Sequence, residues 1–461
     1  MLPVSFKNQH IAIFGLGIEG IDMLKFLSYE GAIITVIDQG PVKKIQKNID
    51  EVDGYKFNLH IGQVKEKHLQ NIKYAFISQG IPLNSEQIAL VHQNNISISS
   101  MTDLFFDRCQ SPIIGITGSS GKTTTTSIIK AILEESKIEH VIGGNIGIGM
   151  LGLLHKINKN TKVILELSHT QLQLLTKSPN ISCITNITPN HLDQFSWNEY
   201  VQLKHKIMLF QKKNDHVVMN LDDENSQDFI KDANAQISYF SANHEIGDEN
   251  GAFMDQDGFL TYKKNDELTK IIHRDEIILK GKHNISNALL AIIIAQMLGV
   301  KAQDCQKGIS KFNGVEHRIE TIAIKNNIEF INDSIATTPE RTITALKSID
   351  KKVILLMGGK DKNLEFGDLV MHIQEKCRFV ILFGESRKKF LLQLESIDIN
   401  IKEVTTLKEA VELACNIVRT GECILLSPGG TSFDEFENYE ERGRFFKKIV
   451  KQIYKDWTKN E

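Results

Sequence analysis

One stretch of the chain combines residue types that can hold a nucleotide. In "SPIIGITGSSGKTTTTSIIK", residues 111–130, an apolar run leads into a glycine loop, a lysine and a helical pattern. A strand, loop and helix in this order leave backbone N–H groups free at the positive end of the helix dipole, where phosphate binds. Lys122 would reach the β- and γ-phosphates, and the Thr123 hydroxyl would ligate Mg²⁺. Ile116 replaces the first glycine of G-x-x-x-x-G-K-[ST], so a plain turn with a solvated lysine is the alternative.

A second nucleotide signature lies near the N-terminus. The stretch "IAIFGLGIEGIDMLKFLSYEGAIITVIDQG" contains Gly15, Gly17 and Gly20, followed by Asp38 at the spacing of a dinucleotide fingerprint. On its own this pattern would predict an NAD-dependent oxidoreductase. No constellation for hydride transfer follows in the sequence, and the loop at Lys122 provides another nucleotide site. The sequence therefore predicts two nucleotide ligands.

The composition is that of a globular protein. The 461 residues correspond to about three domains of ordinary size, and a net charge of −3 gives no large basic field for nucleic acid or anionic membranes. The N-terminal "MLPVSFKNQHIAIFGLG" is read as a strand and not as a signal peptide, and no apolar run is long enough to span a membrane. The six cysteines include no C-x-x-C pair, which favours reduced thiols in a cytoplasmic protein.

Short runs rich in Ile, Val and Leu alternate with longer helical patterns along the chain. The predicted strands are "HIAIFG", "AIITVID", "YAFIS", "SPIIGITG", "TKVILELS", "ISCITNI", "DHVVMN", "KKVILLMGG", "RFVILFG" and "CILLSPGG". Such runs predict parallel strands covered on both faces, with ligands at their carboxyl ends. Breaks near residues 110 and 313 divide the α/β pattern into three domains. Residues 222–280 are more polar, and we predict a peripheral antiparallel insertion there.

The loop "GITGSSGKTTT" resembles the phosphate loop of the Mur ligases and folylpolyglutamate synthases, which read T-G-T-N-G-K-[ST]. Further Mur ligase-like motifs follow in order: "GGNIG" (143–147), "LELSHTQLQ" (165–173), "NITPNHLDQF" (186–195), "KHNISNALLAI" (282–292), "GVEHRIE" (314–320), "NDSIATTP" (332–339) and "SPGGTSFDEFENYEERG" (427–443). The resemblance implies an α/β fold of three domains. These are a Rossmann-like domain for a UDP-linked substrate (1–110), a central P-loop domain for ATP (111–313) and a Rossmann-like glutamate-binding domain (314–461).

The resemblance also implies an ATP-dependent amino-acid ligase of cytoplasmic peptidoglycan precursor synthesis. Such an enzyme phosphorylates the alanyl carboxylate of UDP-N-acetylmuramoyl-L-alanine and then lets the amine of D-glutamate attack the acyl phosphate. Because two anions must meet, the site needs cations and preorganised donors. We expect ATP and two Mg²⁺ ions, a monomeric enzyme, and neither nucleic-acid binding nor membrane insertion.

Four residues carry the chemistry that the resemblance implies. The implied catalytic residues are Lys122, Glu166, His191 and Lys204, and the implied metal ligands are Thr123, Glu166, His191 and Lys204. Glu166 ends the apolar strand "KVILE", so its carboxylate would point into the crevice; a solvated strand-end glutamate is the alternative. His191 would help hold a second Mg²⁺, and Asp193 would support its loop.

Lys204 stands at the spacing where family members carry a carbamylated lysine. Adding CO₂ to the amine turns a cation into an anion with two oxygens, which would ligate the metal. Unmodified, Lys204 would repel the ion. An exposed helix lysine is the alternative, and Lys206 is a neighbouring decoy.

The resemblance assigns three groups of binding residues. Those for ATP are Gly118, Ser119, Ser120, Gly121, Lys122, Thr123, Thr124, Asn284, Asn287, Arg318 and Asp333. Those for the UDP-linked substrate are Gly15, Leu16, Gly17, Ile18, Asp38, Ser78, Gly80, Asn145, Thr170 and Gln171. Those for glutamate are Thr337, Lys362, Ser432, Phe433 and Tyr439. Ser432 is expected where a strand-end glycine turn opens a helix; a plain N-cap is the alternative.

The chain departs from the family pattern at several positions. The departures are Ser120 in place of Asn, Thr170 in place of Phe, Gln39 and Gly40 in place of Thr and Arg, Ile335 in place of Lys, and Thr338 in place of Asn. The last two leave L-glutamate open beside D-glutamate. A folylpolyglutamate-type ligase and a nucleotide-binding protein without catalysis also stay open.

Overall fold

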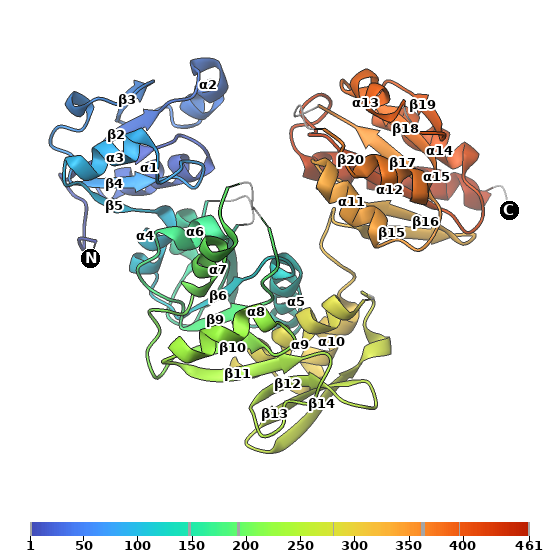
Figure 1. Ribbon diagram of the computed structural model, residues 1–461, viewed down its shortest axis with the longest axis horizontal. Helices are drawn as coiled ribbons and strands as arrows, with labels where there is room; N and C mark the ends of the chain where they lie inside the picture. The colour runs from blue at the N-terminus through green and yellow to red at the C-terminus, as the bar shows by residue number, and fades with distance from the viewer. Residues whose placement is uncertain are drawn as a thin grey trace. The chain divides into compact units, whose positions relative to one another are not determined.

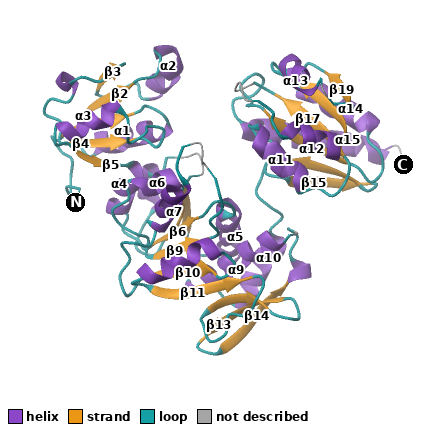
Figure 2. Cartoon of the chain, in the orientation of Figure 1, coloured by secondary structure: helices purple, strands orange, loops and turns teal. Residues whose placement is uncertain are grey.

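The computed structural model describes residues 2–145, 149–190, 194–279, 281–360, 365–395 and 397–459. The chain separates into two compact units, Met1–Phe312 and Asn313–Glu461. Figures 1 and 2 show that both units consist of sheets with helices packed against them. Within the described part of the chain, no helix is both long and apolar enough to cross a membrane.

The first sheet has five parallel strands in the order β3-β2-β1-β4-β5. The strands are β1 (His10–Phe14), β2 (Ile33–Asp38), β3 (Asn58–Ile61), β4 (Tyr74–Ile77) and β5 (Ser97–Ser99). The helices are α1 (Ile18–Tyr29), α2 (Val42–Glu51), η1 (Glu66–His68), α3 (Glu86–Gln93) and α4 (Met101–Arg108). Ile11 and Ile13 of β1 join one core and Phe14 joins another, so both faces are covered, as predicted.

The second sheet has nine strands in the order β14-β13-β12-β11-β10-β9-β6-β8-β7. The strands are β6 (Ile113–Thr117), β7 (His140–Gly144), β8 (Lys162–Glu166), β9 (Ile181–Ile184), β10 (His216–Asn220), β11 (Gln236–Ser241), β12 (Gly251–Met254), β13 (Phe259–Lys264) and β14 (Glu267–His273). The helices are α5 (Lys122–Glu135), η2 (Leu151–Lys156), α6 (His169–Gln173), α7 (Trp197–His205), α8 (Glu224–Gln227), η3 (Asp228–Asp232), η4 (Arg274–Glu276), α9 (Lys282–Met297) and α10 (Ala302–Lys311). Val217 of β10 belongs to the same core as Tyr200 of α7, whereas Val218 belongs to the core that α5 and α9 cover on the other face.

The predicted insertion at residues 222–280 is wrong in its extent. β11 and β12 continue the parallel part of the second sheet, and only β13 and β14 are antiparallel extensions of its edge. The polar residues of β11 made this interior strand look peripheral in the sequence. Ser238 and Ser241 are nevertheless buried, and the Ser241 hydroxyl donates to Asp222 Oδ1 at 2.7 Å.

The third sheet, in the second unit, has the order β15-β16-β20-β17-β18-β19 and is parallel except for β15. The strands are β15 (Glu320–Lys325), β16 (Ile328–Asn332), β17 (Val353–Gly358), β18 (Cys377–Phe383), β19 (Asn400–Glu403) and β20 (Cys423–Gly429). The helices are α11 (Pro339–Lys347), α12 (Leu369–Lys376), α13 (Arg387–Leu394), α14 (Leu407–Ile417) and α15 (Tyr439–Lys459). All apolar runs predicted as strands form strands, and all six cysteines are free thiols. The three-domain boundaries near 110 and 313 stay predictions.

Candidate active site

The phosphate loop connects β6 to α5 and depends on two glycines. Gly118 has φ +146°, and a Cβ there would lie 1.9 Å from Thr185 Oγ1. Gly121 has φ +84°, and a Cβ there would lie 2.5 Å from Asn287 Oδ1. Only glycine fits both positions. Ile116 is buried within β6, so the glycine missing from the usual pattern would fall inside the strand, where none is needed.

The loop takes its shape from the segment that follows β9. Ser119 donates its backbone N–H to the Asn186 carbonyl at 2.8 Å and its hydroxyl to the Thr188 carbonyl at 2.9 Å. Both the N–H and the hydroxyl of Ser120 donate to Asn186 Oδ1, at 3.1 and 3.2 Å. Ser120 therefore makes a polar contact of its own in place of the usual asparagine. Asn186 opens the motif "NITPNHLDQF", but its anchoring role was missed from sequence.

Lys122 and Thr123 occupy the first turn of α5, as predicted. Lys122 Nζ donates to the carbonyl oxygens of Gly118 and Ser119, at 2.8 and 3.4 Å, so its cation lies over the loop. Thr123 and Thr124 are half-buried in the same turn. This arrangement combines a cation, free helix N–H groups and a hydroxyl, which suits a phosphate chain with a metal ion.

Glu166 lies at the carboxyl edge of the second sheet, between Ile116 of β6 and Gly144 of β7. It is 3% exposed. Its Oε1 accepts from Asn145 Nδ2 at 3.4 Å, while Oε2 is buried without a hydrogen-bond partner among the described residues. A buried carboxylate oxygen that lacks a protein donor is costly unless a cation satisfies it. The site therefore has an oxygen ligand and a reason to bind a cation.

Lys204 comes from α7 and is 1% exposed, so it is not an exposed helix lysine. Its Nζ donates to Thr117 Oγ1 at 3.1 Å and lies 5.5 Å from the centre of the Tyr200 ring. Burial lowers the pKa of Lys204 well below its usual value; the Lys122 cation lowers it further, and Glu166 opposes the shift. The shift favours the neutral amine.

Lys206, the alternative to Lys204, does not lie beside Glu166, and the predicted loop residues lie outside the described part of the chain. Lys206 Nζ donates to the Gln173 carbonyl at 2.6 Å, at the end of α6 and not beside Glu166. The predicted residues His191 and Asp193 lie outside the described residues, as does Gly147 of "GGNIG". No group of three His, Cys, Asp or Glu side chains within the described ranges is arranged to hold a metal.

Thr170 and Gln171 belong to α6, which begins just after Glu166 and Ser168. Thr170 Oγ1 donates to Gln79 Oε1 at 2.7 Å, across to the loop after β4. Gln171 is buried, and its Oε1 accepts from the Ser168 N–H at 3.0 Å. Its Nε2 has no partner within the described part of the chain. The two N–H donors of this amide are therefore uncommitted there.

The dinucleotide-type fingerprint forms a pocket of about 600 Å³ at the carboxyl edge of the first sheet. Of the predicted residues, those that line it are Gly15, Gly17, Ile18, Asp38, Ser78 and Gly80. The Asp38 carboxylate accepts from Leu16 N at 2.8 Å and from Gly40 N at 2.7 Å, so it holds the glycine loop and the turn after β2 together. A Cβ at Gly20 would lie 1.9 Å from the Gly15 carbonyl oxygen, which explains the third glycine.

Two asparagines of α9 have different surroundings. Asn287 is buried, and its Oδ1 accepts from Thr125 Oγ1 of α5 at 3.2 Å, so it braces the helix of the phosphate loop. Its Nδ2 donates to Asn284 Oδ1 at 3.4 Å. Asn284 is half-buried in the first turn of α9.

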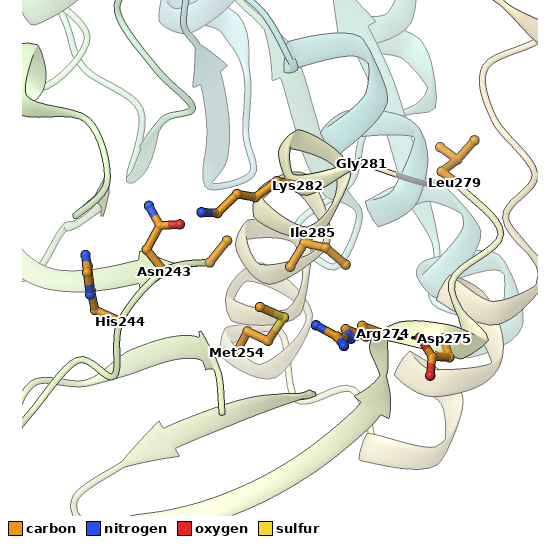
Figure 3. Close-up of a pocket in the computed structure, with 10 residues that line it drawn as sticks. Asn243, His244, Met254, Arg274, Asp275, Leu279, Gly281, Lys282 and Ile285 are labelled. Carbon is orange, nitrogen blue, oxygen red and sulfur yellow. Dashed lines mark ion pairs between the residues drawn. The ribbon is translucent and has the colours of Figure 1, made fainter. Parts of the chain in front are cut away.

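A hollow of about 830 Å³ adjoins that first turn of α9. Figure 3 shows Lys282 extending toward Asn243, with Ile285 and Met254 facing the same space and Arg274 at its lower side. Apolar side chains such as Met254 and Ile285 and polar side chains such as Asn243 and Lys282 both line the hollow, a combination that suits a flat heterocyclic ligand. It lies beside the carboxyl end of β11, where α/β sheets bind ligands.

In the second unit, Asp333 follows β16 and is 3% exposed. It accepts from the Ser427 hydroxyl at 2.8 Å and from the Ile319 N–H at 3.1 Å. Burial raises the pKa of Asp333 to about 7, although both hydrogen bonds and the cations of Arg318 and Arg341 oppose the rise. Arg318 and Asp333 are therefore brought together, their contacts with ATP stay a prediction, and Arg341 is a cation that sequence reasoning missed.

The predicted glutamate residues also belong to this unit. Ser432 is 2% exposed, whereas Phe433 is 67% exposed. Thr337 is half-buried, and the Tyr439 carbonyl accepts from the Ser334 hydroxyl at 2.8 Å. Burial, with Glu440, raises the pKa of Tyr439 to about 12. Lys362 lies outside the described residues.

The helix expected near Ser432 is wrong, because α15 begins at Tyr439. Ser432 opens a turn instead, in which its carbonyl accepts from Glu435 N at 3.2 Å and Phe436 N at 2.8 Å. Its hydroxyl has no hydrogen-bond partner among the described residues, so the N-cap interpretation does not hold.

Arg442 ties the two motifs of this unit together, and sequence reasoning missed it. It is fully buried. Its guanidinium donates to the Ser334 hydroxyl and carbonyl, at 3.0 and 2.8 Å, and to the Gly430 carbonyl at 3.0 Å. The loop of Asp333 and the glycine turn before Ser432 are thereby fixed to each other. Its place in "YEERG" on a helix resembled a solvated charge, so no signal pointed to it.

Family models match three successive parts of the chain. The Mur ligase MurD-like N-terminal domain matches residues 9–100, the Mur ligase middle domain matches residues 116–295, and the Mur ligase glutamate ligase domain matches residues 317–430. The matches follow the order of the three sheets.

Relatives match the chain along nearly its full length. The UDP-N-acetylmuramoylalanine–D-glutamate ligases of Acetivibrio thermocellus and Ruminiclostridium cellulolyticum are each 36% identical to it, over 97% of both chains. The solved UDP-N-acetylmuramate–alanine ligase of Thermotoga maritima is 17% identical, with a TM-score of 0.55 over 96% of this chain and all of that one. The pseudomurein peptide ligase of Methanothermus fervidus is 19% identical, with a TM-score of 0.53 over 97% of this chain and all of that one. These structures share the fold, and the sequence relatives show that the chain belongs to the Mur ligase family.

Proposed function

We propose that the protein is an ATP-dependent ligase that adds D-glutamate to UDP-N-acetylmuramoyl-L-alanine, in cytoplasmic peptidoglycan precursor synthesis. The observation that carries the proposal is the grouping of Lys122, Glu166 and Lys204 at the carboxyl ends of the parallel strands of the second sheet. The names of the relatives that match over 97% of both chains support the choice of substrates. We further propose that the enzyme works as a monomer.

The reaction has two steps. The alanyl carboxylate attacks the γ-phosphorus of ATP, so that the bond to ADP breaks and an acyl phosphate forms. The neutral amine of glutamate then attacks the acyl carbon, phosphate leaves, and the nitrogen loses a proton as the amide forms. Lys122 would balance the charge that builds up on the γ-phosphate, because preorganised cations stabilise this charge without reorganisation.

The residues present fit a magnesium ion. Mg²⁺ keeps several waters and needs only a few protein oxygens, and Glu166 Oε2 and the Thr123 hydroxyl are available for it. We propose Lys204, once carbamylated, and His191 as further ligands, and a second ion as in the family pattern. When bound, the ion would draw the two reacting anions together.

The two pockets suggest where the nucleotide parts of the two substrates bind. The hollow of about 600 Å³ at the first sheet would take the UDP end of the donor, with its diphosphate at the N-terminus of α1. The adenosine of ATP would lie at the first turn of α9, beside Asn284, where the hollow of about 830 Å³ adjoins it. Asn287 would act by bracing α5.

Arg341 supplies a cation near position 335, where the family pattern has a lysine and this chain has Ile335. Its Nη1 donates to the Ile335 carbonyl at 2.9 Å, so a cation lies at this loop although the side chain at 335 is apolar. This contact supports an active ligase despite the departure. Ser432, with its hydroxyl uncommitted among the described residues, is proposed to bind the distal carboxylate of glutamate.

The assay that tests the proposal measures ADP release and the amide product with UDP-N-acetylmuramoyl-L-alanine and each glutamate enantiomer. Turnover with D-glutamate alone is expected. Turnover with L-glutamate alone would change the proposed amino-acid substrate to L-glutamate but keep the proposed reaction. An absence of turnover with either, in a protein that still binds ATP and UDP, would favour a nucleotide-binding protein without catalysis.

Ser432→Ala should raise the glutamate KM by roughly tenfold or more, because a hydrogen bond to a charged group contributes about 1.5 to 3 kcal/mol. The KM values of ATP and of the UDP-linked donor should stay within about twofold. A normal glutamate KM would remove Ser432 from the site.

A further inference from the structure

Helix α1 carries two carboxylates, Glu19 and Asp22, which lie three residues apart and so share one face of the helix. Glu19 Oε2 accepts from the Gln79 N–H at 2.9 Å, and Glu19 Oε1 accepts from Gln79 Nε2. Gln79 Oε1 in turn accepts from the hydroxyls of Ser168, at 3.0 Å, and Thr170, at 2.7 Å. Glu19 is thus connected through Gln79 to the start of α6.

Asp22 makes the second connection. Its carboxylate accepts from Leu151 N at 2.7 Å and Gly152 N at 3.1 Å, the first two residues of η2. It therefore caps a helix of the second sheet from a helix of the first. A Cβ at Gly149 would lie 2.4 Å from Asp22 Cγ, so the contact is close enough to require glycine there.

These contacts end beside the two loops that flank the candidate metal site. Ser168 and Thr170 follow Glu166 in the chain, and η2 follows the loop that carries Asn145, whose side chain donates to Glu166. The other end of the same system is the nucleotide pocket, which Gly17, Ile18, Glu19 and Gln79 line. One helix thus touches the nucleotide pocket and both loops.

Burial raises the pKa of Glu19 and of Asp22, and the hydrogen bonds from Gln79 and from the Leu151 and Gly152 N–H groups oppose the rise. The nearby Asp22 carboxylate also raises the pKa of Glu19. Two buried carboxylates so close together are unfavourable in their charged forms unless hydrogen-bond donors stabilise them. The donors are therefore needed to keep both carboxylates in position.

We propose that Glu19, Gln79 and Asp22 are positioning residues that fix the span between the nucleotide pocket and Glu166, and so align a UDP-linked acyl donor that must occupy both ends. The inference rests on the proposed function. A ligand of the pocket alone, such as UDP, has no second end to align. A donor that bridges both ends loses rate steeply with a misplacement of about 1 Å, on the order of 100-fold.

The kinetic test compares Gln79→Leu and Asp22→Asn with the wild type. The kcat/KM for UDP-N-acetylmuramoyl-L-alanine should fall at least tenfold, whereas the inhibition constant of UDP and the KM of ATP should stay within twofold. Gln46→Leu is the matched control, since Gln46 donates to Asp50 at 2.9 Å on the exposed side of α2, and it should leave all three constants unchanged. Unchanged donor kinetics in both Gln79→Leu and Asp22→Asn would overturn the proposal, as would equal weakening of UDP and donor.

A second test uses amide hydrogen exchange and needs no turnover. UDP-N-acetylmuramoyl-L-alanine added to the wild type without ATP should slow exchange in residues 149–153 and in α6, and this protection should vanish in Gln79→Leu and Asp22→Asn while β6 stays protected. UDP alone should give no such protection. Equal protection by UDP alone, or donor-dependent protection that persists in both variants, would overturn the proposal. Donor-dependent protection without ligase activity would instead reject the proposed function and keep the alignment.

Discussion

At the scale of single residues, burial supports the metal-binding role that we propose for Lys204. A lysine within a parallel α/β core needs a partner, and its Nζ donates to the Thr117 hydroxyl, a neutral group, at 3.1 Å. Because burial and Lys122 lower its pKa, the neutral amine that reacts with CO₂ is favoured. Carbamylation would then give Glu166 a second anion with which to share a cation.

Lys204→Ala should abolish ligation, and short carboxylates such as acetate should restore part of the activity by replacing the missing anion at the metal. Lys206→Ala is the control, because Lys206 bonds to the Gln173 carbonyl and should keep nearly full activity. Full activity of Lys204→Ala without added carboxylate would show that the lysine serves packing alone.

Asp333 predicts a pH dependence of stability. Its folded pKa of about 7 lies above the ordinary value of 3.8, so the folded state binds the proton more tightly than the unfolded state does. The stabilisation is complete below the ordinary value and is lost as the pH rises through about 7, by at most about 1.4 kcal/mol per pH unit. Asp333→Asn removes this titration, so the variant should gain stability relative to the wild type between pH 5 and pH 8.

Calorimetry of the full chain at the two pH values measures this difference through the melting temperature of the second unit. Parallel pH profiles of wild type and variant would mean that Asp333 stays charged in the folded protein. The Asn variant should also bind ATP less tightly if Asp333 contacts the ribose, and this loss should grow as the pH rises through about 7, because the amide resembles the protonated acid more closely than the carboxylate.

Site residues could be proposed only where the side chain stands in a recognisable motif, and their roles stay predictions. Lys122, Glu166 and Lys204 were predicted, and the structure brings them together. Gln79 and Arg442 were not, because their partners are distant in sequence and a neutral amide or a helical arginine has an ordinary surface role. Contacts of this kind depend on tertiary packing, which no local pattern encodes.

At the scale of elements, a comparison of two glycines separates the effect of an unfavourable backbone conformation from the effect of a steric clash. Gly118→Ala would place a methyl group 1.9 Å from Thr185 Oγ1, so the phosphate loop must move. The KM for ATP should rise at least tenfold. Gly54→Ala is the control, because Gly54 also has a positive φ, +93°, but no atom within 4 Å of its Cβ position.

Both variants should lose about 1 kcal/mol of stability from the unfavourable backbone conformation, as urea unfolding would show. Only Gly118→Ala should alter ATP kinetics. An equal effect of both variants on the ATP constant would mean that strain, and not the shape of the loop, is responsible.

The elements show which local signals are reliable. Strands buried on both faces were predicted from continuous apolar runs, because a parallel sheet needs them. β11 was misjudged since two buried serines interrupt its pattern, and α15 was placed too early since the turn from Ser432 to Asn438 is held by backbone bonds that composition does not reveal. Side-chain polarity is thus a weaker guide where polar groups have buried partners.

At the scale of the whole molecule, two sheets of the first unit each end at a helix N-terminus suited to phosphate, α1 at the nucleotide pocket and α5 at the phosphate loop. If both are used, the protein has two separate nucleotide sites that recognise different molecules. Asp38 and Lys122 belong to different sites, so their variants should affect different ligands.

Isothermal titration of the full chain with UDP, ATP with Mg²⁺, and NADH tests this division. Lys122→Ala should weaken ATP binding at least tenfold, because it removes the cation over the phosphate loop, and should leave UDP affinity within twofold. Asp38→Ala should do the reverse, since its carboxylate holds the Leu16 and Gly40 N–H groups that shape the nucleotide pocket. ATP should not compete with UDP in the wild type. Saturable NADH binding without UDP binding would reverse the assignment of the first sheet and restore the oxidoreductase interpretation, and competition between UDP and ATP would mean that one site serves both.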